Sequence, residues 1–248
     1  MKNAGIDIGS RTIKVVVIEN DKIILSKVIT STYNPAETCS ELLKKITYDK
    51  ITATGYGRHL IGKILNCSVI SEIKAFGLGA RLLYPGCKDI LDIGGQDIKA
   101  ISLDSSGRVN KFEMNDKCAA GTGKFLEVMA AALHLTLTEF SEKASKAEKP
   151  YEISNMCAVF AESEVISLIT QGADRNEIAL GIHHAVARRA ATLMRKVNAC
   201  GPAIFAGGAA YNKCLKQLIE KELNIKLHIS ENPQIIGAMG AALNNNNN

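Results

Sequence analysis

The sequence of 248 residues predicts an α/β fold built from two related domains with a ligand cleft between them. Residues 4–18 and 89–104 each carry an apolar strand, the tripeptide Asp-Ile-Gly, a polar turn and a second strand that contains Ile-Lys. Between and after these units, stretches with apolar residues at helical spacing alternate with short β-rich runs. Two similar hairpin units in one chain indicate an internal duplication, and the space between two such domains is a common place for a ligand.

The first half of the chain is expected to form a domain over residues 1–88. Its hairpin is followed by a third β-rich run, a short helix and a strand that enters a glycine turn, predicted at residues 23–30, 41–46 and 51–58. A further helix is predicted over residues 71–83, ending near Pro85 and Gly86, which do not continue a helix.

The second half is expected to form a domain over residues 89–231. Its hairpin is followed by a turn at residues 105–107 and another strand. Apolar residues at helical spacing then predict three helices, the last of them stopped by Gly201 and Pro202, before a strand that ends in two glycines. These helices are predicted at residues 125–135, 159–169 and 176–199, and the strand at residues 203–207.

The C-terminal segment, residues 232–248, is predicted to be a helix that packs back on the first domain. Asn232 and Pro233 are expected to start it, because proline is favoured at the first helical position. The five asparagines at the end are of low complexity, and no role is assigned to them.

Composition limits the classes of function. Charged residues make up 22% of the chain, and the formal charge of +5 comes from scattered Lys and Arg rather than a basic stripe, so no nucleic-acid partner is expected. The longest uncharged apolar stretches are about nine residues, against roughly 20 for a spanning helix, so no membrane is expected. Asp7 stands where a signal peptide would need apolar residues, which favours a cytoplasmic protein.

Two glycine-containing turns and a later glycine pair predict a nucleotide site. Turns of glycine and small polar residues expose backbone N–H groups, which bind phosphate. Carboxylates at the ends of the leading strands can hold Mg²⁺ through water. The candidate catalytic residues are Asp7, Asp92 and Gln96. The candidate nucleotide-binding residues are Gly9, Ser10, Arg11, Thr12, Lys14, Gly94, Gly95, Gln96, Gly207, Gly208 and Gln234.

Three segments resemble the phosphate 1, phosphate 2 and adenosine motifs of the superfamily of actin, sugar kinases and heat-shock 70 ATPases: GIDIGSRTIK, LDIGGQDIK and FAGGAAYN. Three more resemble the activators of 2-hydroxyacyl-CoA dehydratases in the BadF/BadG/BcrA/BcrD ATPase family, which also includes benzoyl-CoA reductase subunits: residues 53–58, 114–130 and 157–167. The resemblance runs over residues 4–243. It implies two actin-like (ribonuclease H-like) domains, ATP and ADP as ligands, and ATP hydrolysis. Arg11 departs from the pattern, since the activators carry a small hydroxyl residue there.

Seven cysteines, an odd number with no C-x-x-C pair, do not suggest disulfides in a cytoplasmic chain. Cys118 and Cys157 each precede a predicted helix, and a helix N-terminus favours the thiolate that binds metal. Two thiolates are too few for a 4Fe–4S cluster, which takes four. The resemblance implies a homodimer that holds one such cluster through Cys118 and Cys157 of both chains. The other five cysteines are interpreted as ordinary thiols.

The resemblance implies an ATP-hydrolysing iron–sulfur activator that passes single low-potential electrons to a partner dehydratase or reductase, with ferredoxin or flavodoxin as donor. One alternative partner is another cluster-containing reductase, either benzoyl-CoA reductase-like or a double-cubane cluster protein. A second alternative is a small-molecule kinase of the same superfamily, for which no substrate base is evident. A third is a chaperone-like or filament-forming module, although residues 4–243 leave no separate substrate-binding domain.

Overall fold

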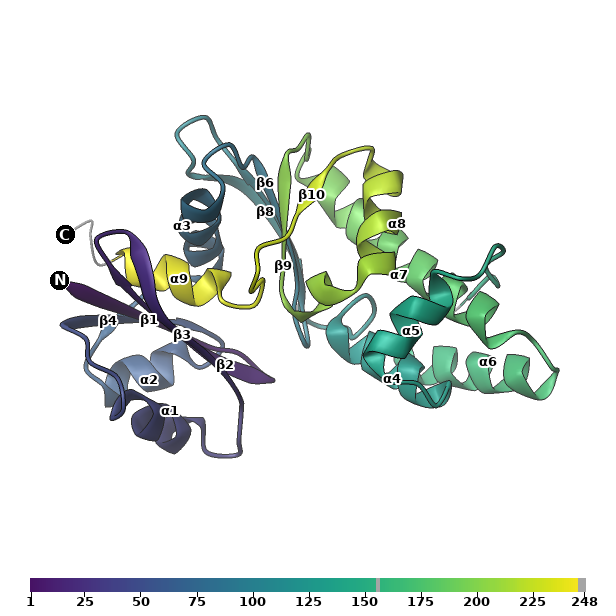
Figure 1. The fold of residues 1–248 in the computed structure, drawn as a ribbon, viewed down its shortest axis with the longest axis horizontal. Coiled ribbons are helices and arrows are strands. Elements are labelled where there is room, and N and C mark those ends of the chain that lie inside the picture. The colour runs from purple at the N-terminus through teal and green to yellow at the C-terminus, as the bar shows by residue number, and fades with distance from the viewer. Residues whose placement is uncertain (155–156, 245–248) are drawn as a thin grey trace.

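Two five-stranded sheets with the same strand order form the frame of the molecule (Figure 1). The computed structural model describes residues 1–154 and 157–244. The first sheet, in the order β3-β2-β1-β4-β5, contains β1 (Lys2–Ile8), β2 (Thr12–Glu19), β3 (Lys22–Thr30), β4 (Lys50–Gly55) and β5 (Ser68–Val69). The second, in the order β10-β9-β6-β7-β8, contains β6 (Asp89–Ile93), β7 (Ile98–Leu103), β8 (Val109–Asn115), β9 (Ala203–Ala206) and β10 (Leu227–His228). The predicted α/β fold is confirmed.

The two sheets repeat each other in strand direction as well as in order. β1 pairs antiparallel with β2 and parallel with β4, and β6 pairs antiparallel with β7 and parallel with β9. The hairpin registers also agree, because Asp7 lies opposite Lys14 and Asp92 lies opposite Lys99. The duplication seen in the sequence is therefore a duplication of structure down to individual side-chain pairs.

Two helices, α1 (Pro35–Leu43) and α2 (Arg58–Ile64), cover one face of the first sheet (Figure 1). Their buried residues share one core with alternate residues of β1 and β2. The helix α1 begins six residues before the expected start at residue 41. Its start is set by Asn34, whose side chain accepts a hydrogen bond from the backbone N–H of Glu37, and by Pro35 in the first turn.

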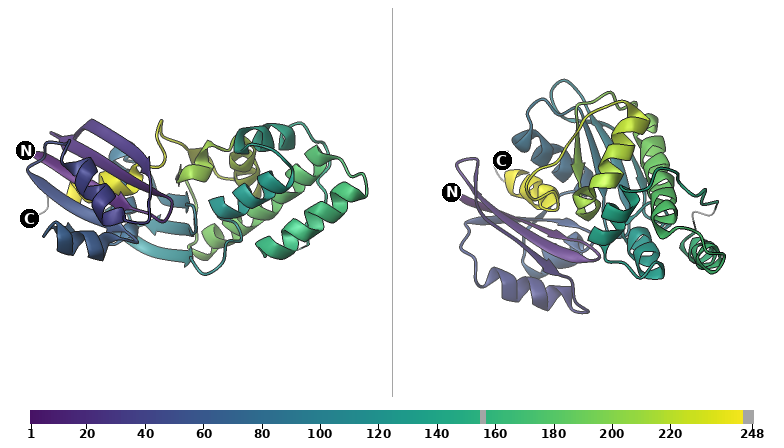
Figure 2. Two further views of the ribbon diagram at one scale, coloured as in Figure 1. Left: turned by 90° about the horizontal axis from the view of Figure 1, so that it is seen from below. Right: turned by 45° about the vertical axis from the view of Figure 1, so that its right-hand side comes forward.

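Two crossed helices, α3 (Glu72–Leu83) and α9 (Ile236–Leu243), lie between the sheets (Figures 1 and 2). α9 packs on β1 and β2, while Phe76 and Ala80 of α3 join the core of the second sheet. The helices touch at Gly79 and Gly240, where a Cβ atom on either residue would overlap the backbone of the other helix. Glycine at both positions allows this close crossing. A domain boundary at residue 88 stays a prediction.

The remaining helices cover the second sheet and extend from its far end (Figure 2). They are α4 (Gly123–Ala132), α5 (Leu137–Ala144), α6 (Ala158–Thr170), α7 (Arg175–Lys196), the 3-10 helix η1 (Gly208–Tyr211) and α8 (Lys213–Leu223). α7 packs against both α5 and α8, and the largest core includes the fully buried Phe125, Phe140 and Phe205. In the described ranges, none of the helices combines the length and the apolar character that crossing a membrane requires.

The final helix begins at Ile236, so the prediction that Asn232 and Pro233 start it is wrong. The Asn232 side chain accepts a hydrogen bond from the N–H of Gln234, and the Pro233 carbonyl accepts one from Gly207 at 3.0 Å. These bonds hold the segment as a turn against the end of β9. Residues 245–248, the end of the predicted helix, lie outside the described residues.

Candidate functional site

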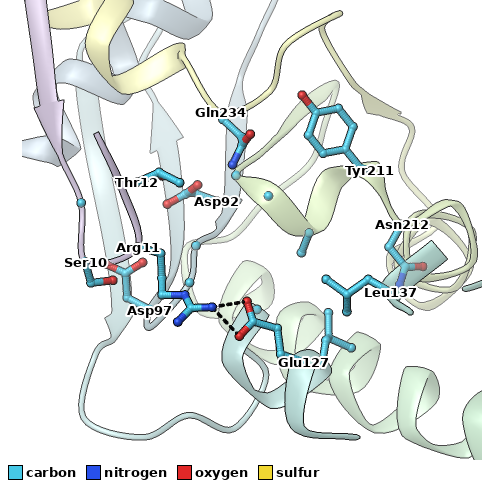
Figure 3. Close-up of a pocket in the computed structure, with 18 of the residues that line it drawn as sticks. Ser10, Arg11, Thr12, Asp92, Asp97, Glu127, Leu137, Tyr211, Asn212 and Gln234 are labelled. Carbon is cyan, nitrogen blue, oxygen red and sulfur yellow. Dashed lines mark hydrogen bonds and ion pairs between the residues drawn. The ribbon is translucent and has the colours of Figure 1, made fainter. Parts of the chain in front are cut away.

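A cleft of about 1030 Å³ opens between the two halves of the molecule (Figure 3). Its walls come from the β1–β2 turn, the β6–β7 turn, the first turn of α3, the helices α4 and α5, and η1. The volume is at the upper end of the range for small-molecule and cofactor sites. The two duplicated hairpins therefore present their turns to one shared cavity.

The β1–β2 turn places four of the candidate residues, Gly9 to Thr12, at the cleft. It is closed by a hydrogen bond from the N–H of Gly9 to the carbonyl of Thr12 at 3.0 Å. Behind it, the Lys14 ammonium lies 3.1 Å from the Asp7 carboxylate. A cation beside the turn and backbone N–H groups within it make this wall suitable for an anion.

The β6–β7 turn repeats this construction on the other wall. The N–H of Gly94 donates to the carbonyl of Asp97 at 2.9 Å, and the Lys99 ammonium lies 3.1 Å from the Asp92 carboxylate. Lys14–Asp7 and Lys99–Asp92 are thus equivalent pairs, each seven residues apart. A polyphosphate lying between the turns would face the same arrangement from both sides.

Nearly all the predicted nucleotide-site residues line the cleft. The exception is Gln96, which is exposed and is not among the lining residues, because its neighbour Asp97 turns into the cleft in its place. The lining residues among the candidates are Asp7, Gly9, Ser10, Arg11, Thr12, Lys14, Asp92, Gly94, Gly95, Gly207, Gly208 and Gln234. Gln234 enters from the turn before α9 (Figure 3).

Lys99 is a buried charged residue of the cleft that the sequence motifs did not predict. Its side chain is only 3% exposed, and its ammonium lies 2.6 Å from Asp97, 3.1 Å from Asp92 and 3.5 Å from Glu72. Burial alone lowers the pKa of Lys99, but the three carboxylates raise it above its ordinary value. Lys99 therefore stays charged and holds the acidic wall together. The repeated Ile-Lys of the two hairpins was the available signal.

Of these three carboxylates, that of Glu72 in the first turn of α3 lies farthest from the Lys99 ammonium, at 3.5 Å. Burial raises the pKa of Glu72 to about 7, against an ordinary value of 4.5, and the neighbouring Asp7, Asp97 and Asp92 add to the rise that Lys99 opposes. A group with this pKa exchanges a proton near neutral pH, and it does so in the wall of the cleft.

The cleft also offers oxygen ligands for the expected Mg²⁺. Asp7 and Asp92 are buried at the ends of β1 and β6, and Oδ1 of Asp7 is a buried atom without a hydrogen-bond partner. Across residues 1–154 and 157–244, no three His, Cys, Asp or Glu side chains are placed to hold a metal ion directly. A hydrated Mg²⁺, held through its waters and by phosphate, fits such a donor set.

A buried network behind the cleft fixes the side chain of Asn212, which lines it. Asn212 Oδ1 accepts from the Ser141 hydroxyl and from the N–H of Leu215, both at 2.9 Å, so its amide N–H₂ must donate to His183 Nε2 at 2.8 Å. His183 Nδ1 then carries the hydrogen and donates to the Ala179 carbonyl at 2.7 Å. His183 is fully buried, and burial lowers its pKa to about 4.

This network predicts a pH dependence of stability. A His whose pKa is about 4 when folded and 6.5 when unfolded stabilises the protein above pH 6.5, and this contribution is lost as the pH falls towards 4. The difference corresponds to about 3 kcal/mol. We expect the unfolding free energy to fall less between pH 6.5 and 4 in His183→Gln than in the wild type, measured by urea denaturation. In His184→Gln the slope should fall by less, because burial also lowers the pKa of this histidine but the residue is only half-buried. Equal slopes in all three proteins would contradict the assignment.

Cys157 and Cys118 both lie on the surface of the second half of the molecule, and both thiols are free. Cys157 is the N-cap of α6, as expected. Cys118 is not at a helix start: α4 begins at Gly123, and Cys118 lies in the preceding loop, where its Sγ is 3.5 Å from the N–H of Ala120. α4 and α6 pack against each other, so the two cysteines belong to neighbouring elements.

The other five cysteines differ in their surroundings. Cys39, Cys87 and Cys214 are buried, Cys67 is half-buried and Cys200 is exposed. Burial raises the pKa of the Cys39 and Cys87 thiols to about 11, which leaves them protonated and unreactive at neutral pH. Their placement agrees with their interpretation as ordinary thiols.

Two repeated hairpins that face one cleft define a nucleotide-binding protein of the two-lobed, actin-like class. A glucokinase of the ROK family from Streptomyces griseus, solved with glucose and AMPPNP, matches with a TM-score of 0.62 at 11% identity, over 98% of both chains, and this likeness concerns the fold alone. The chain belongs to the BadF/BadG/BcrA/BcrD ATPase family, whose model matches residues 4–244. The predicted family and the actin-like fold are confirmed.

Two relatives show which members of this family the chain is similar to. The (R)-2-hydroxyglutaryl-CoA dehydratase activating ATPase of Acidaminococcus fermentans is 38% identical over 248 residues, 96% of this chain and 95% of that protein. The activator of the 2-hydroxyisocaproyl-CoA dehydratase from Clostridium difficile, solved with bound ADPNP, matches with a TM-score of 0.87 at 36% identity, over 98% of this chain and 94% of that chain. The chain is thus similar to dehydratase activators over nearly its whole length.

Proposed function

We propose that this protein is an ATP-hydrolysing iron–sulfur activator that passes single low-potential electrons to a partner dehydratase or reductase. The observation that carries the proposal is a direct link between the β6–β7 turn and the start of α4, which follows the loop that carries Cys118. The β1–β2 and β6–β7 turns are called the first and second phosphate turns below. The N–H groups of Gly123 and Lys124, the first two residues of α4, donate to the carbonyls of Gly94 and Gly95 at 2.8 and 2.9 Å. A shift of the turn on nucleotide binding or hydrolysis moves α4, and with it the loop that carries Cys118.

On the nucleotide side, the carboxylates of Asp7 and Asp92 would hold the waters of a Mg²⁺ ion, and the ion would help to bind the phosphates. Lys14 and Lys99 hold these two carboxylates in place through ion pairs of 3.1 Å. Glu72, whose pKa burial raises to about 7, lines the same cleft and would accept a proton from the water that attacks the phosphate.

On the redox side, Cys118 and Cys157 of two copies supply the four thiolates that a 4Fe–4S cluster takes. When bound, the cluster stores and releases single electrons at low potential. The N-terminus of α6 at Cys157 stabilises the thiolate form. Val159 and Phe160 in the next turn of α6 are 68% and 63% exposed, and a second copy of the chain would cover these apolar side chains.

The names of two relatives support the choice of partner. The relatives from Acidaminococcus fermentans and Clostridium difficile are activators of 2-hydroxyacyl-CoA dehydratases, and we propose an enzyme of that class as the partner of this protein. Another relative is a component of the benzoyl-CoA reductase of Thauera aromatica, which keeps an aromatic acyl-CoA reductase as the second candidate. Reduced ferredoxin or flavodoxin would reload the activator.

The proposal is tested on protein purified without oxygen. The expected result is a brown preparation that loses its absorbance in air and that, once reduced, passes electrons to a 2-hydroxyacyl-CoA dehydratase only while ATP is hydrolysed. A colourless preparation with full kinase activity on a sugar or a carboxylic acid would contradict it and favour a small-molecule kinase of the same fold.

A further inference from the structure

One ion pair crosses the mouth of the cleft from the first phosphate turn to α4 (Figure 3). Arg11 Nη2 lies 3.0 Å from Oε1 and 2.8 Å from Oε2 of Glu127, residues that are 116 positions apart in the chain. Their side chains are 50% and 32% exposed, so both remain accessible to a ligand that enters the cleft. The pair joins the two halves of the molecule across the space that a polyphosphate would occupy.

Arg11 touches the second phosphate turn as well as its own. Its aliphatic stem lies so close to Gly95 that a Cβ atom there would overlap Cγ of Arg11. The guanidinium is therefore held over the point where the two turns face each other. Among the described residues that line the cleft, Arg11 is the sole arginine, and a guanidinium binds carboxylate and phosphate with the same two-pronged geometry.

Glu127 has a second cation available. The ammonium of Lys124, one turn earlier on α4, lies 3.6 Å from Oε2 of Glu127. If the Arg11 side chain turned away, the Glu127 carboxylate would still have Lys124 as a partner on its own helix. The loss of Arg11 therefore does not leave Glu127 as an isolated charge. A ligand that binds Arg11 can therefore shift Glu127 from one cation to the other.

We propose that the terminal phosphate of a bound nucleoside triphosphate competes with Glu127 for Arg11, so that Arg11 and Glu127 together distinguish triphosphate from diphosphate. A diphosphate leaves the pair intact and the cleft tied across its mouth. A triphosphate takes the guanidinium and frees α4 from the first phosphate turn. The inference deepens the proposed function and rests on its nucleotide part alone.

The test compares the affinities for ADP and for a non-hydrolysable ATP analogue, each with Mg²⁺, by titration calorimetry. Glu127→Gln removes the competitor, so the preference for the ATP analogue over ADP should rise about threefold to tenfold. Arg11→Gln should lower that preference by a similar factor. Glu142→Gln, which removes a carboxylate that lines the same cleft from α5, should change both affinities alike and leave their ratio near that of the wild type.

A further variant separates the ion pair from the phosphate contact. The double exchange Arg11→Glu with Glu127→Arg keeps opposite charges facing each other but removes the cation from the first turn, so it should lose the preference for the triphosphate. An unchanged ratio in Glu127→Gln, with its melting temperature near that of the wild type, would overturn the inference while leaving the ATPase proposal standing. The absence of nucleotide binding in the wild type would overturn both.

Discussion

Cys118→Ala is expected to bind ATP nearly as well as the wild type and to lose its iron and its electron transfer. The reason is that each substitution removes two of the four thiolates of a shared cluster, because both copies of the chain lose the same ligand. The nucleotide site should be preserved, since Cys118 is an exposed residue of the loop before α4 and does not line the cleft. The measurements are iron content and the rate of ATP-dependent electron transfer, both without oxygen.

Cys200→Ala is the matched control. Cys200 is also a free, exposed thiol of the second half of the molecule, but it lies outside residues 114–130 and 157–167, which carry Cys118 and Cys157. It should keep full iron and full activity, whereas Cys157→Ala should behave like Cys118→Ala. Retention of iron and redox activity by Cys118→Ala would refute the ligand assignment.

Lys99→Met is expected to lower the unfolding free energy by about 3–5 kcal/mol at neutral pH. It leaves Asp92, Asp97 and Glu72 close together without their cation, and a buried charge that loses its partner is strongly destabilising. Lys99 is more buried than the other charged residues that line the cleft in the described part of the chain, so solvent does little to screen the loss. Urea unfolding at pH 7 measures the effect.

Lys14→Met serves for comparison, because Lys14 is the duplicate of Lys99 in the first hairpin. Its ammonium has one carboxylate partner, Asp7, and its side chain is 14% exposed. The loss in that variant should be well below the loss in Lys99→Met. Equal losses of unfolding free energy in the two variants would mean that the three carboxylates around Lys99 do not destabilise the protein when their cation is removed.

Both glycine turns of the cleft could be predicted from the sequence because their pattern is local. Asp7, Gly9 and Lys14 lie within eight residues, and a hairpin register alone brings Asp7 opposite Lys14. The same reasoning, applied to the second hairpin, would have found Lys99 through its equivalence to Lys14. Its third carboxylate partner could not be found in this way, since Glu72 arrives on α3, which packs on the second sheet only in the folded chain.

Helices with a clear apolar pattern were predicted from the sequence. The short helices α5 and α8 were not predicted, although capping residues mark their first turns. α5 is eight residues long, yet Thr136 and Glu139 form a reciprocal capping box that is visible in the sequence. α8 likewise begins with the capping residue Asn212. By contrast, nothing in the sequence could pair Arg11 with Glu127 across 116 positions, because that contact depends on how the two halves face each other.

We expect two copies of this chain to share one iron–sulfur cluster under the control of nucleotide. Native mass spectrometry of protein prepared without oxygen tests it most directly, because one spectrum reports both the number of chains and the bound metal. The expected species has two chains and carries four iron and four sulfide ions, and it falls apart or loses the cluster on exposure to air. A single chain free of iron would contradict the claim and leave an ATPase of another purpose.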